Sequence, residues 1–292
     1  MMVARSLCLR RNPVRLPVAV LRNTRLILFG ALIVSVSVQT SFAWGPEGHR
    51  IVARVAELRL KPKAKAALEA LIPGEHLSDN YICNWPDYVR NDEPETGPWH
   101  YVDIPYDAKA YDAARDCPDG QCIVAQIKVC AASLADRKAS AGDRRRALCF
   151  LVHFVGDLHQ PLHCVSRDDD RGGNLRTIRY PGQLEDTNLH SVWDASLVHA
   201  NLQGQDPIAY ADGLNATIAF WPAYWWSRGT VAGWAWEGRE AAVQYVYAGV
   251  PPTGGPAFAL GEDYIVASRR VVNRQLMKGG VRLAAVLNHC LR

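Results

Sequence analysis

Histidine and aspartate occur twice in this chain with the same spacing, as His153 and Asp157 and again as His190 and Asp194. On a helix, residues four apart lie about 40° apart around the axis, so both side chains of each pair can reach one cation. His163 follows shortly after the first pair. Imidazole and carboxylate ligands without thiolates suit zinc, and water completes such sites when they are catalytic.

Each of these residues also has a simpler interpretation when taken alone. His153 lies in an apolar run and could be a hydrogen-bonded core histidine, Asp157 could be an ordinary helix-end carboxylate, and His190 and Asp194 could form a surface pair. Their occurrence together favours a metal site. The candidate ligands are His49, Asp87, His100, His153, Asp157, His163, His190 and Asp194.

Residues 1–43 have the layout of a secretory signal, and Trp44 would be the first residue after cleavage. Arg22 and Arg25 precede an apolar run over 26–34, and Ser41-Phe42-Ala43 has small residues at both recognition positions for cleavage. The freed α-amine of Trp44 would lose its proton readily. Together with the Trp44 carbonyl and the His49 ring it can chelate a metal, so we expect maturation to complete a metal site. An uncleaved membrane anchor fits less well, because the apolar run is shorter than a membrane span.

Charge and length point to a single exported domain over residues 44–292. Cleavage would remove six arginines and no acidic residue, which changes the formal net charge from +4 to −2. Nucleic-acid binding by a lysine- and arginine-rich surface is therefore excluded. The remaining residues are enough for one buried core. We expect a secreted or periplasmic protein that has no membrane contact after processing.

The cysteines agree with export. Cys117 and Cys122 close a short loop rich in turn residues and are predicted to form a disulfide. Seven cysteines remain after cleavage, so at least one thiol stays free or pairs between chains. Cys130 and Cys149 lie in apolar helical runs and are expected to be buried thiols.

Helical patterns dominate the elements that must position these residues, which predicts an all-α class. Asp143 is expected to cap the helix that carries His153. The predicted helices cover 47–70 with a break at Lys61–Pro62, 123–138, 143–158, 187–198 and 262–291, where Gly279 and Gly280 weaken the last one. Residues 73–98 are expected to be mostly loop, 99–103 extended, and 178–180 a short strand.

Several motifs together resemble a known family. They are Trp44-Gly-x-x-Gly-His49, Trp85-x-Asp87, His100-Tyr-x-Asp103, Leu151-Val-His-Phe-x-Gly-Asp-x-x-Gln-Pro-Leu-His163, Gly172-Gly-Asn174 and Asn188-Leu-His-Ser-x-Trp-Asp194. In these motifs the chain is similar to the type I, single-strand-specific zinc nucleases, the S-one/P-one family, which is related to bacterial zinc phospholipase C. The resemblance runs from Trp44 to about residue 200 and returns near 278–284.

The resemblance implies a single-domain helical phospholipase C/nuclease-like fold with a short β-hairpin and long loops. It also implies three zinc ions. The first would be held by Asp87, His100, His153 and Asp157, and the second by His163, His190 and Asp194. The third would be held by the Trp44 amine and carbonyl, His49 and the other oxygen of Asp157.

The same resemblance implies a monomeric endonuclease that cleaves single-stranded RNA and DNA to 5′-phosphorylated products and also acts on 3′-nucleotides. Asp87 would assist the attack of water on phosphorus. Tyr101, Asp103 and Asn174 match the nucleobase pocket, although Phe is common at the position of Tyr101. Arg90 stands where Lys is common and could still hold phosphate. A base stacks on an aromatic ring only when it is unpaired, which predicts single-strand preference.

Two other functions remain open at this point. A zinc phospholipase C would share the metal ligands, and a non-catalytic domain stiffened by zinc would use them only for stability. The Cys117–Cys122 loop, the segment from His100 to Asp103, and Asn174 favour the nuclease. Release of 5′-mononucleotides from RNA, rather than diacylglycerol from lecithin, would decide between the two enzymes.

Overall fold

The computed structural model describes residues 44–292, which all belong to one unit of the fold. The predicted signal sequence lies outside the described residues. Helices dominate this part of the chain, which confirms the all-α class.

The elements lie in the following order along the chain. The α-helices are α1 (Pro46–Leu58), α2 (Pro62–Leu71), α3 (Asn80–Cys83), α4 (Trp85–Asp92), α5 (Ala113–Asp116), α6 (Ile123–Ala135), α7 (Ala141–Asp157), α8 (Leu189–Ser191), α9 (Leu197–Leu202), α10 (Pro207–Thr217), α11 (Phe220–Trp226), α12 (Val231–Ala241) and α13 (Glu262–Cys290). The other helical turns are η1 (Pro94–His100), η2 (Pro118–Gly120), η3 (Pro161–Cys164), η4 (Val192–Ser196) and η5 (Ala242–Val246). The strands are β1 (Thr177–Arg179), β2 (Thr187–Asn188) and β3 (Phe258–Ala259).

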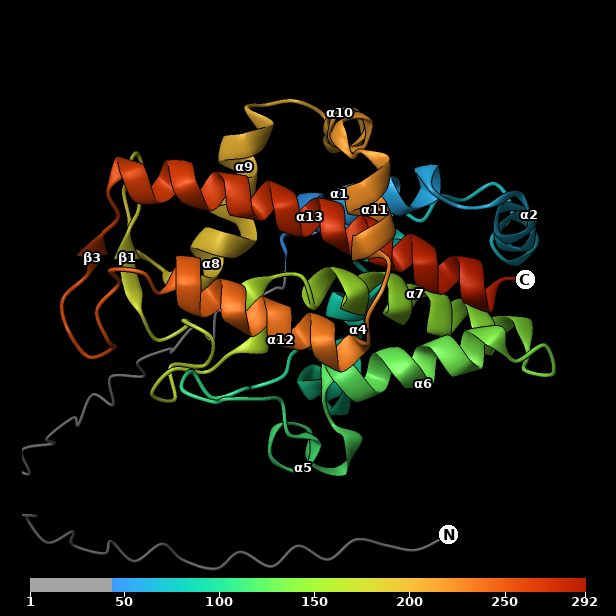
Figure 1. Cartoon of the computed structure of the whole chain (residues 1–292), viewed down its shortest axis with the longest axis horizontal. Coiled ribbons are helices and arrows are strands. Elements are labelled where there is room, and N and C mark those ends of the chain that lie inside the picture. Colours follow the sequence, from blue (N-terminus) through green and yellow to red (C-terminus); the bar gives the residue numbers. More distant parts are fainter. Residues whose placement is uncertain (1–43) are drawn as a thin grey trace, which may run out of the picture. The chain divides into compact units, whose positions relative to one another are not determined.

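The long helix α13 packs against α1 and α7, which carry ligand candidates (Figure 1). The helix runs unbroken through Gly279 and Gly280 despite their low helix propensity. A Cβ atom at Gly280 would lie 2.4 Å from Cγ1 of Val55. Gly280 therefore lets α13 approach α1 closely, and packing offsets its low helix propensity.

The two predictions for residues 73–103 were wrong. Residues 73–98, expected to be mostly loop, contain α3, α4 and most of η1. Proline lies in the first turn of α4 and of η1. Backbone N–H groups in the first turn have no hydrogen-bond partner within the helix, so proline is tolerated there and does not break these helices. His100 ends η1, so the extended backbone begins only at Tyr101.

The helix α7 begins earlier than predicted. Its N-cap is Ser140, whose hydroxyl accepts the Asp143 N–H at 3.1 Å. Asp143 lies in the first turn and not at the cap. In this position its carboxylate interacts favourably with the positive end of the helix dipole.

A small sheet with strand order β2-β1-β3 lies at one end of α13 (Figure 1). β1 and β2 form the expected antiparallel hairpin, with Ile178 paired to Thr187. β3 adds in parallel to β1, and no sequence pattern had predicted this third strand.

The region with little motif signal, 201–260, forms α10, α11, α12 and η5. Trp234 is buried, whereas Trp221 and Trp225 on α11 are exposed. Among residues 44–292, no helix combines the length and the apolar character needed to cross a bilayer.

Candidate metal centre

The C-terminal end of α7 lies at the middle of the candidate site. His153 and Asp157 are fully buried there, one helical turn apart. The Nδ1–H of His153 donates to the carbonyl of Cys83 at 2.7 Å, because a carbonyl can only accept. This leaves Nε2 of His153 facing Oδ2 of Asp157 at 3.3 Å.

The carboxylate of Asp157 joins ligand candidates from two sides. Its Oδ1 lies 3.2 Å from Nε2 of His49 on α1, and its Oδ2 lies 3.0 Å from Nδ1 of His100 at the end of η1. Oδ1 of Asp87 on α4 lies 3.7 Å from Nε2 of His153. Four separate elements, α1, α4, η1 and α7, therefore bring five potential ligands together. We refer to these five residues as the Asp157 group.

A second group consists of His163, His190 and Asp194, all buried. Nε2 of His190 lies 3.0 Å from Nε2 of His163 and 3.4 Å from Oδ2 of Asp194. The helix predicted over 187–198 begins at Leu189 and contains a π-helical turn, η4, which includes Asp194. Such turns are often found at functional sites. We refer to these three residues as the His190 group.

The ring orientations in the His190 group fit a bound cation. The Nδ1–H of His163 donates to the His100 carbonyl and that of His190 to the Gly172 carbonyl, each at 2.7 Å. Burial lowers the pKa of His163 to about 3 and that of His190 to about 4, so both rings are neutral. The two Nε2 lone pairs therefore face each other, an arrangement that a metal ion stabilises.

The Asp157 group also fits metal ions, because it contains buried polar atoms without a hydrogen-bond partner. They include both ring nitrogens of His49, Nε2 of His100, and one carboxylate oxygen each of Asp87 and Asp157. Unsatisfied buried polar atoms are costly, and a coordinated cation would satisfy them. Burial opposes ionisation of Asp157. Electrostatic attraction by the His153 ring, together with hydrogen bonds from His100 and His153, nevertheless holds the pKa of Asp157 well below the usual range.

Trp44 is completely buried at the start of the described chain. The N–H of the next residue, Gly45, donates to the Asp194 carbonyl at 2.9 Å. This bond holds the chain at 44–45 beside the His190 group, while His49 lies in the Asp157 group one turn into α1. The position is compatible with the expected role of Trp44, and metal binding by its amine stays a prediction.

A pocket of about 570 Å³ opens beside both groups. Its walls include the histidines His100, His163 and His190. They also include all four predicted substrate-binding residues, which are Arg90, Tyr101, Asp103 and Asn174. Nη2 of Arg90 lies 3.4 Å from Oδ1 of Asp87. The pocket therefore places the guanidinium of Arg90, the ring of Tyr101 and two hydrogen-bonding side chains next to the potential metal ligands.

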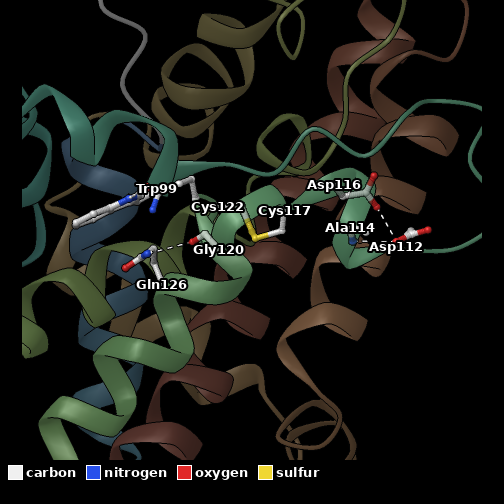
Figure 2. The surroundings of a disulfide bond; sticks show 9 residues. Trp99, Asp112, Ala114, Asp116, Cys117, Gly120, Cys122 and Gln126 are labelled. Atoms are coloured by element: carbon white, nitrogen blue, oxygen red, sulfur yellow. Dashed lines mark hydrogen bonds between the residues drawn. A yellow bond between two sulfur atoms is a disulfide. The ribbon is translucent and has the colours of Figure 1, made fainter.

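The Cys117–Cys122 disulfide closes a short loop between α5 and α6 (Figure 2). The N–H of Ile123, the residue after the bond, donates to the Tyr101 carbonyl at 3.0 Å. Gln121 within the loop accepts the indole N–H of Trp99 at 2.8 Å. The five other cysteines in the described residues are buried free thiols, including Cys130 and Cys149 as expected.

The structure brings to the site several residues for which the sequence predicted no role. Gln160 is fully buried and donates its amide N–H to Oδ1 of Asp194 at 2.6 Å. It lies in the motif that ends at His163, so a signal for it was present. The pocket also contains Ser166, Asp169 and Arg171, for which the spacing gave no signal.

Fold and site together define a class: an all-α protein whose buried histidine and aspartate groups can hold metal ions beside a polar pocket. The family model described as S1/P1 Nuclease matches residues 44–292. The chain belongs to the S1/P1 nuclease family, whose members cleave nucleic acids, and the resemblance seen in its motifs is confirmed.

Individual relatives agree with this assignment. Endonuclease 2 of Arabidopsis thaliana is 33% identical over 267 residues, covering 84% of this chain and 89% of the relative. Endonuclease 4 of the same plant is 30% identical over 282 residues, covering 88% and 92%. Nuclease P1 of Penicillium citrinum is 29% identical over 273 residues, covering 84% and 97%.

Proposed function

We propose that this chain, after removal of residues 1–43, is an exported endonuclease that holds three zinc ions and cleaves single-stranded RNA and DNA. Water would break the bond between phosphorus and the 3′ oxygen, so the phosphate stays on the 5′ side. The same chemistry would release phosphate from 3′-nucleotides. The observation that carries the proposal is the opening of two buried histidine–aspartate groups onto one pocket that can hold a nucleotide.

The proposed ligands follow the two groups. Asp87, His100, His153 and Asp157 would hold one ion, and His163, His190 and Asp194 a second. The Trp44 amine and carbonyl, His49 and Oδ1 of Asp157 would hold the third. The two oxygens of Asp157 face opposite partners, which supports its proposed role as a bridge between ions. When bound, zinc would activate water and neutralise charge on the phosphate.

The residues of the chain have distinct proposed tasks around the reacting phosphate. Asp87 lies within 3.9 Å of both His100 and His153 and would accept a proton from the attacking water. Arg90, next to Asp87, would bind a phosphate oxygen. Gln160 would hold Asp194 in place through its short amide bond.

The pocket would select unpaired bases. Tyr101 is 41% exposed, so its ring face is available for stacking. Asp103 and Asn174 would hydrogen-bond the stacked base. A base inside a duplex is already stacked and paired, so it cannot enter the pocket. This supports single-strand preference without a basic groove, in keeping with the charge of −2 expected after processing.

We further propose that the processed protein is a monomer in the periplasm or outside the cell. The small loop disulfide supports an oxidising compartment. Phosphate attraction would come mainly from the three ions at the site, since the processed chain has no excess of basic residues.

Metal removal and product analysis test this function. Chelation should abolish hydrolysis of single-stranded RNA, and added zinc should restore it, with three zinc ions per folded protein. The released mononucleotides should carry 5′-phosphate. Activity that survives complete metal removal would contradict the proposal, and so would diacylglycerol release from lecithin without nuclease activity, which is the outcome expected of a phospholipase C.

A further inference from the structure

One wall of the pocket is a loop, residues 166–176, whose backbone adopts an unusual conformation. The φ angles are positive at Asp168 (53°), Asp169 (55°) and Arg171 (54°), and also at the following glycines, Gly172 and Gly173. Left-handed backbone costs a non-glycine residue roughly 1 kcal/mol or more. Three such residues close together require contacts from outside the loop to hold them.

Asp170, in the middle of this loop, provides a buried contact of this kind, besides those that Arg167 and Arg176 make with the carbonyls of residues 250–252. It is almost completely buried, while its neighbours Asp169 and Arg171 line the pocket. Its Oδ1 accepts the Arg167 N–H at 3.1 Å, and its Oδ2 accepts the hydroxyl proton of Tyr247 at 2.7 Å. One buried carboxylate therefore ties the loop to itself and to a residue 77 positions further along the chain.

Tyr247 follows directly after η5, in the region where the motifs gave little signal. It is buried, and the Arg167 guanidinium lies 4.1 Å from the centre of its ring. Burial, together with Asp170, raises the pKa of Tyr247 far above its ordinary value, so the hydroxyl keeps its proton and remains a donor. Arg167 also donates to the Val250 and Pro251 carbonyls, each at 3.0 Å.

The part of the loop nearest the metal ligands is fixed in a different way. The Gly172 carbonyl accepts the His190 Nδ1–H at 2.7 Å, and a Cβ atom at Gly172 would lie 2.4 Å from the Leu162 carbonyl oxygen. The Asn174 side chain donates to the Arg171 carbonyl at 2.8 Å, so Asn174 follows the position of Arg171. Loss of the Tyr247 contact would therefore shift Arg171 and Asn174 more than His190.

We propose that Tyr247, acting through Asp170, is a positioning residue that holds Arg171 and Asn174 against the bound nucleotide. This inference rests on the proposed function, because it assumes that the pocket binds the nucleotide. It gives the C-terminal region a role in substrate binding, although Tyr247 does not line the pocket.

The Tyr247→Phe variant tests this role, since it removes one oxygen atom and keeps the ring stacked on Arg167. The KM for a single-stranded oligonucleotide should rise about tenfold, because a hydrogen bond to a buried carboxylate is lost. The kcat should stay within about twofold and the bound zinc unchanged, because the His190 contact remains. Hydrogen exchange of the amides in 167–175 should become faster.

Two further variants separate positioning from general stability. Tyr210→Phe also removes a tyrosine hydroxyl, one that donates to Asn273 at 2.9 Å outside the pocket walls, and should leave KM unchanged. Asp170→Asn can keep both contacts, because its amide oxygen accepts from Arg167 and its N–H donates to the Tyr247 oxygen. Its KM should stay near that of the wild type, whereas Asp170→Ala should raise it.

The proposal is overturned if Tyr247→Phe has the KM of the wild type or if Tyr210→Phe raises KM equally. If Tyr247→Phe does not fold, equal KM values for Asp170→Asn and Asp170→Ala overturn it instead. Asn174→Ala distinguishes failure of this inference from failure of the proposed function. If it raises KM while Tyr247→Phe does not, only this inference fails; if neither variant changes KM, the nucleotide pocket of the proposed function fails as well.

Discussion

Oδ1 of Asp157 lies 3.2 Å from Nε2 of His49, on the side of the carboxylate opposite to His100. One side chain thus connects α1 to the end of η1 through α7. In the proposed site the Asp157 carboxylate is a ligand of two ions, whereas Asp194 is a ligand of one.

Asp157→Asn should therefore lose two of the three metal ions, because an amide is a weaker and neutral ligand. Asp194→Asn should lose only one. Elemental analysis of the folded variants measures the difference. Equal losses in the two variants would show that Asp157 does not bridge two ions.

An additional residue before Trp44 should remove the third metal ion and most of the activity, because the chelating amine becomes an ordinary amide. The comparison is between protein processed to begin at Trp44 and protein that begins one alanine earlier, with zinc content and RNA hydrolysis measured for both. Three zinc ions and full turnover in the extended form would exclude a role for the terminal amine.

Tyr101→Ala should raise the KM for single-stranded oligonucleotides by about tenfold or more, since base stacking on an aromatic ring contributes roughly 1–3 kcal/mol. Tyr101→Phe keeps the ring and serves as the matched control, with KM close to the wild type. Steady-state kinetics on one oligonucleotide decides the matter. A KM that is the same in the alanine variant would place the base elsewhere.

Base preference should change with pH through Asp103. Burial in the pocket raises the pKa of Asp103 to about 6, and the charges of Asp170 and Asp169 contribute. Above this pH the carboxylate only accepts hydrogen bonds, and below it the carboxyl group can donate one. The ratio of kcat/KM for guanine to that for adenine substrates should rise with pH through about 6, since guanine offers two adjacent donors, N1–H and N2–H, to a carboxylate, whereas adenine has one amino donor next to the acceptor N1.

The ratio cancels titrations that affect both substrates equally, such as those at the metal ligands. In Asp103→Asn it should be independent of pH, and a ratio that still changes would assign the effect to another group.

The same pKa shift determines how the contribution of Asp103 to folding stability changes with pH. Because folding raises the pKa of Asp103, its ionisation opposes folding, and its contribution falls as pH rises from about 4 to about 6.

Loss of the Cys117–Cys122 disulfide should lower the free energy of unfolding by about 2 kcal/mol, as expected for a loop of this length. Urea denaturation of the double serine variant measures this change. A reducing agent should lower the midpoint of the wild type and leave the variant unaffected, since the other cysteines among residues 44–292 are unpaired. A further shift of the variant by reductant would reveal another disulfide.

The sequence predicted the parts of this site that depend on local spacing. His153 and Asp157 lie one turn apart on a helix, so their shared side followed from helix geometry. The carbonyls of Cys83 and Gly172, which orient His153 and His190, could not be predicted in this way. Every residue has a carbonyl, and only the folded backbone decides which of them meets a ring nitrogen.

The fold shows the same division. The helices α1, α6, α7 and α13 follow from apolar periodicity, whereas η4 and the third strand depend on neighbours distant in sequence. The contact between Tyr247 and Asp170 belongs to this second kind. Neither residue lies in a recognisable pattern with the other, so only the structure connects them.

The hydrogen bond between Gly45 and Asp194 joins the start of the described chain to a position far along it. A polypeptide growing from its N-terminus on the ribosome cannot make this contact until residue 194 has been synthesised. The His190 group, and the position of Trp44 beside it, therefore cannot be complete in a shorter nascent chain. Under the proposed function, the full set of metal ligands can therefore assemble only after residue 194 has been synthesised.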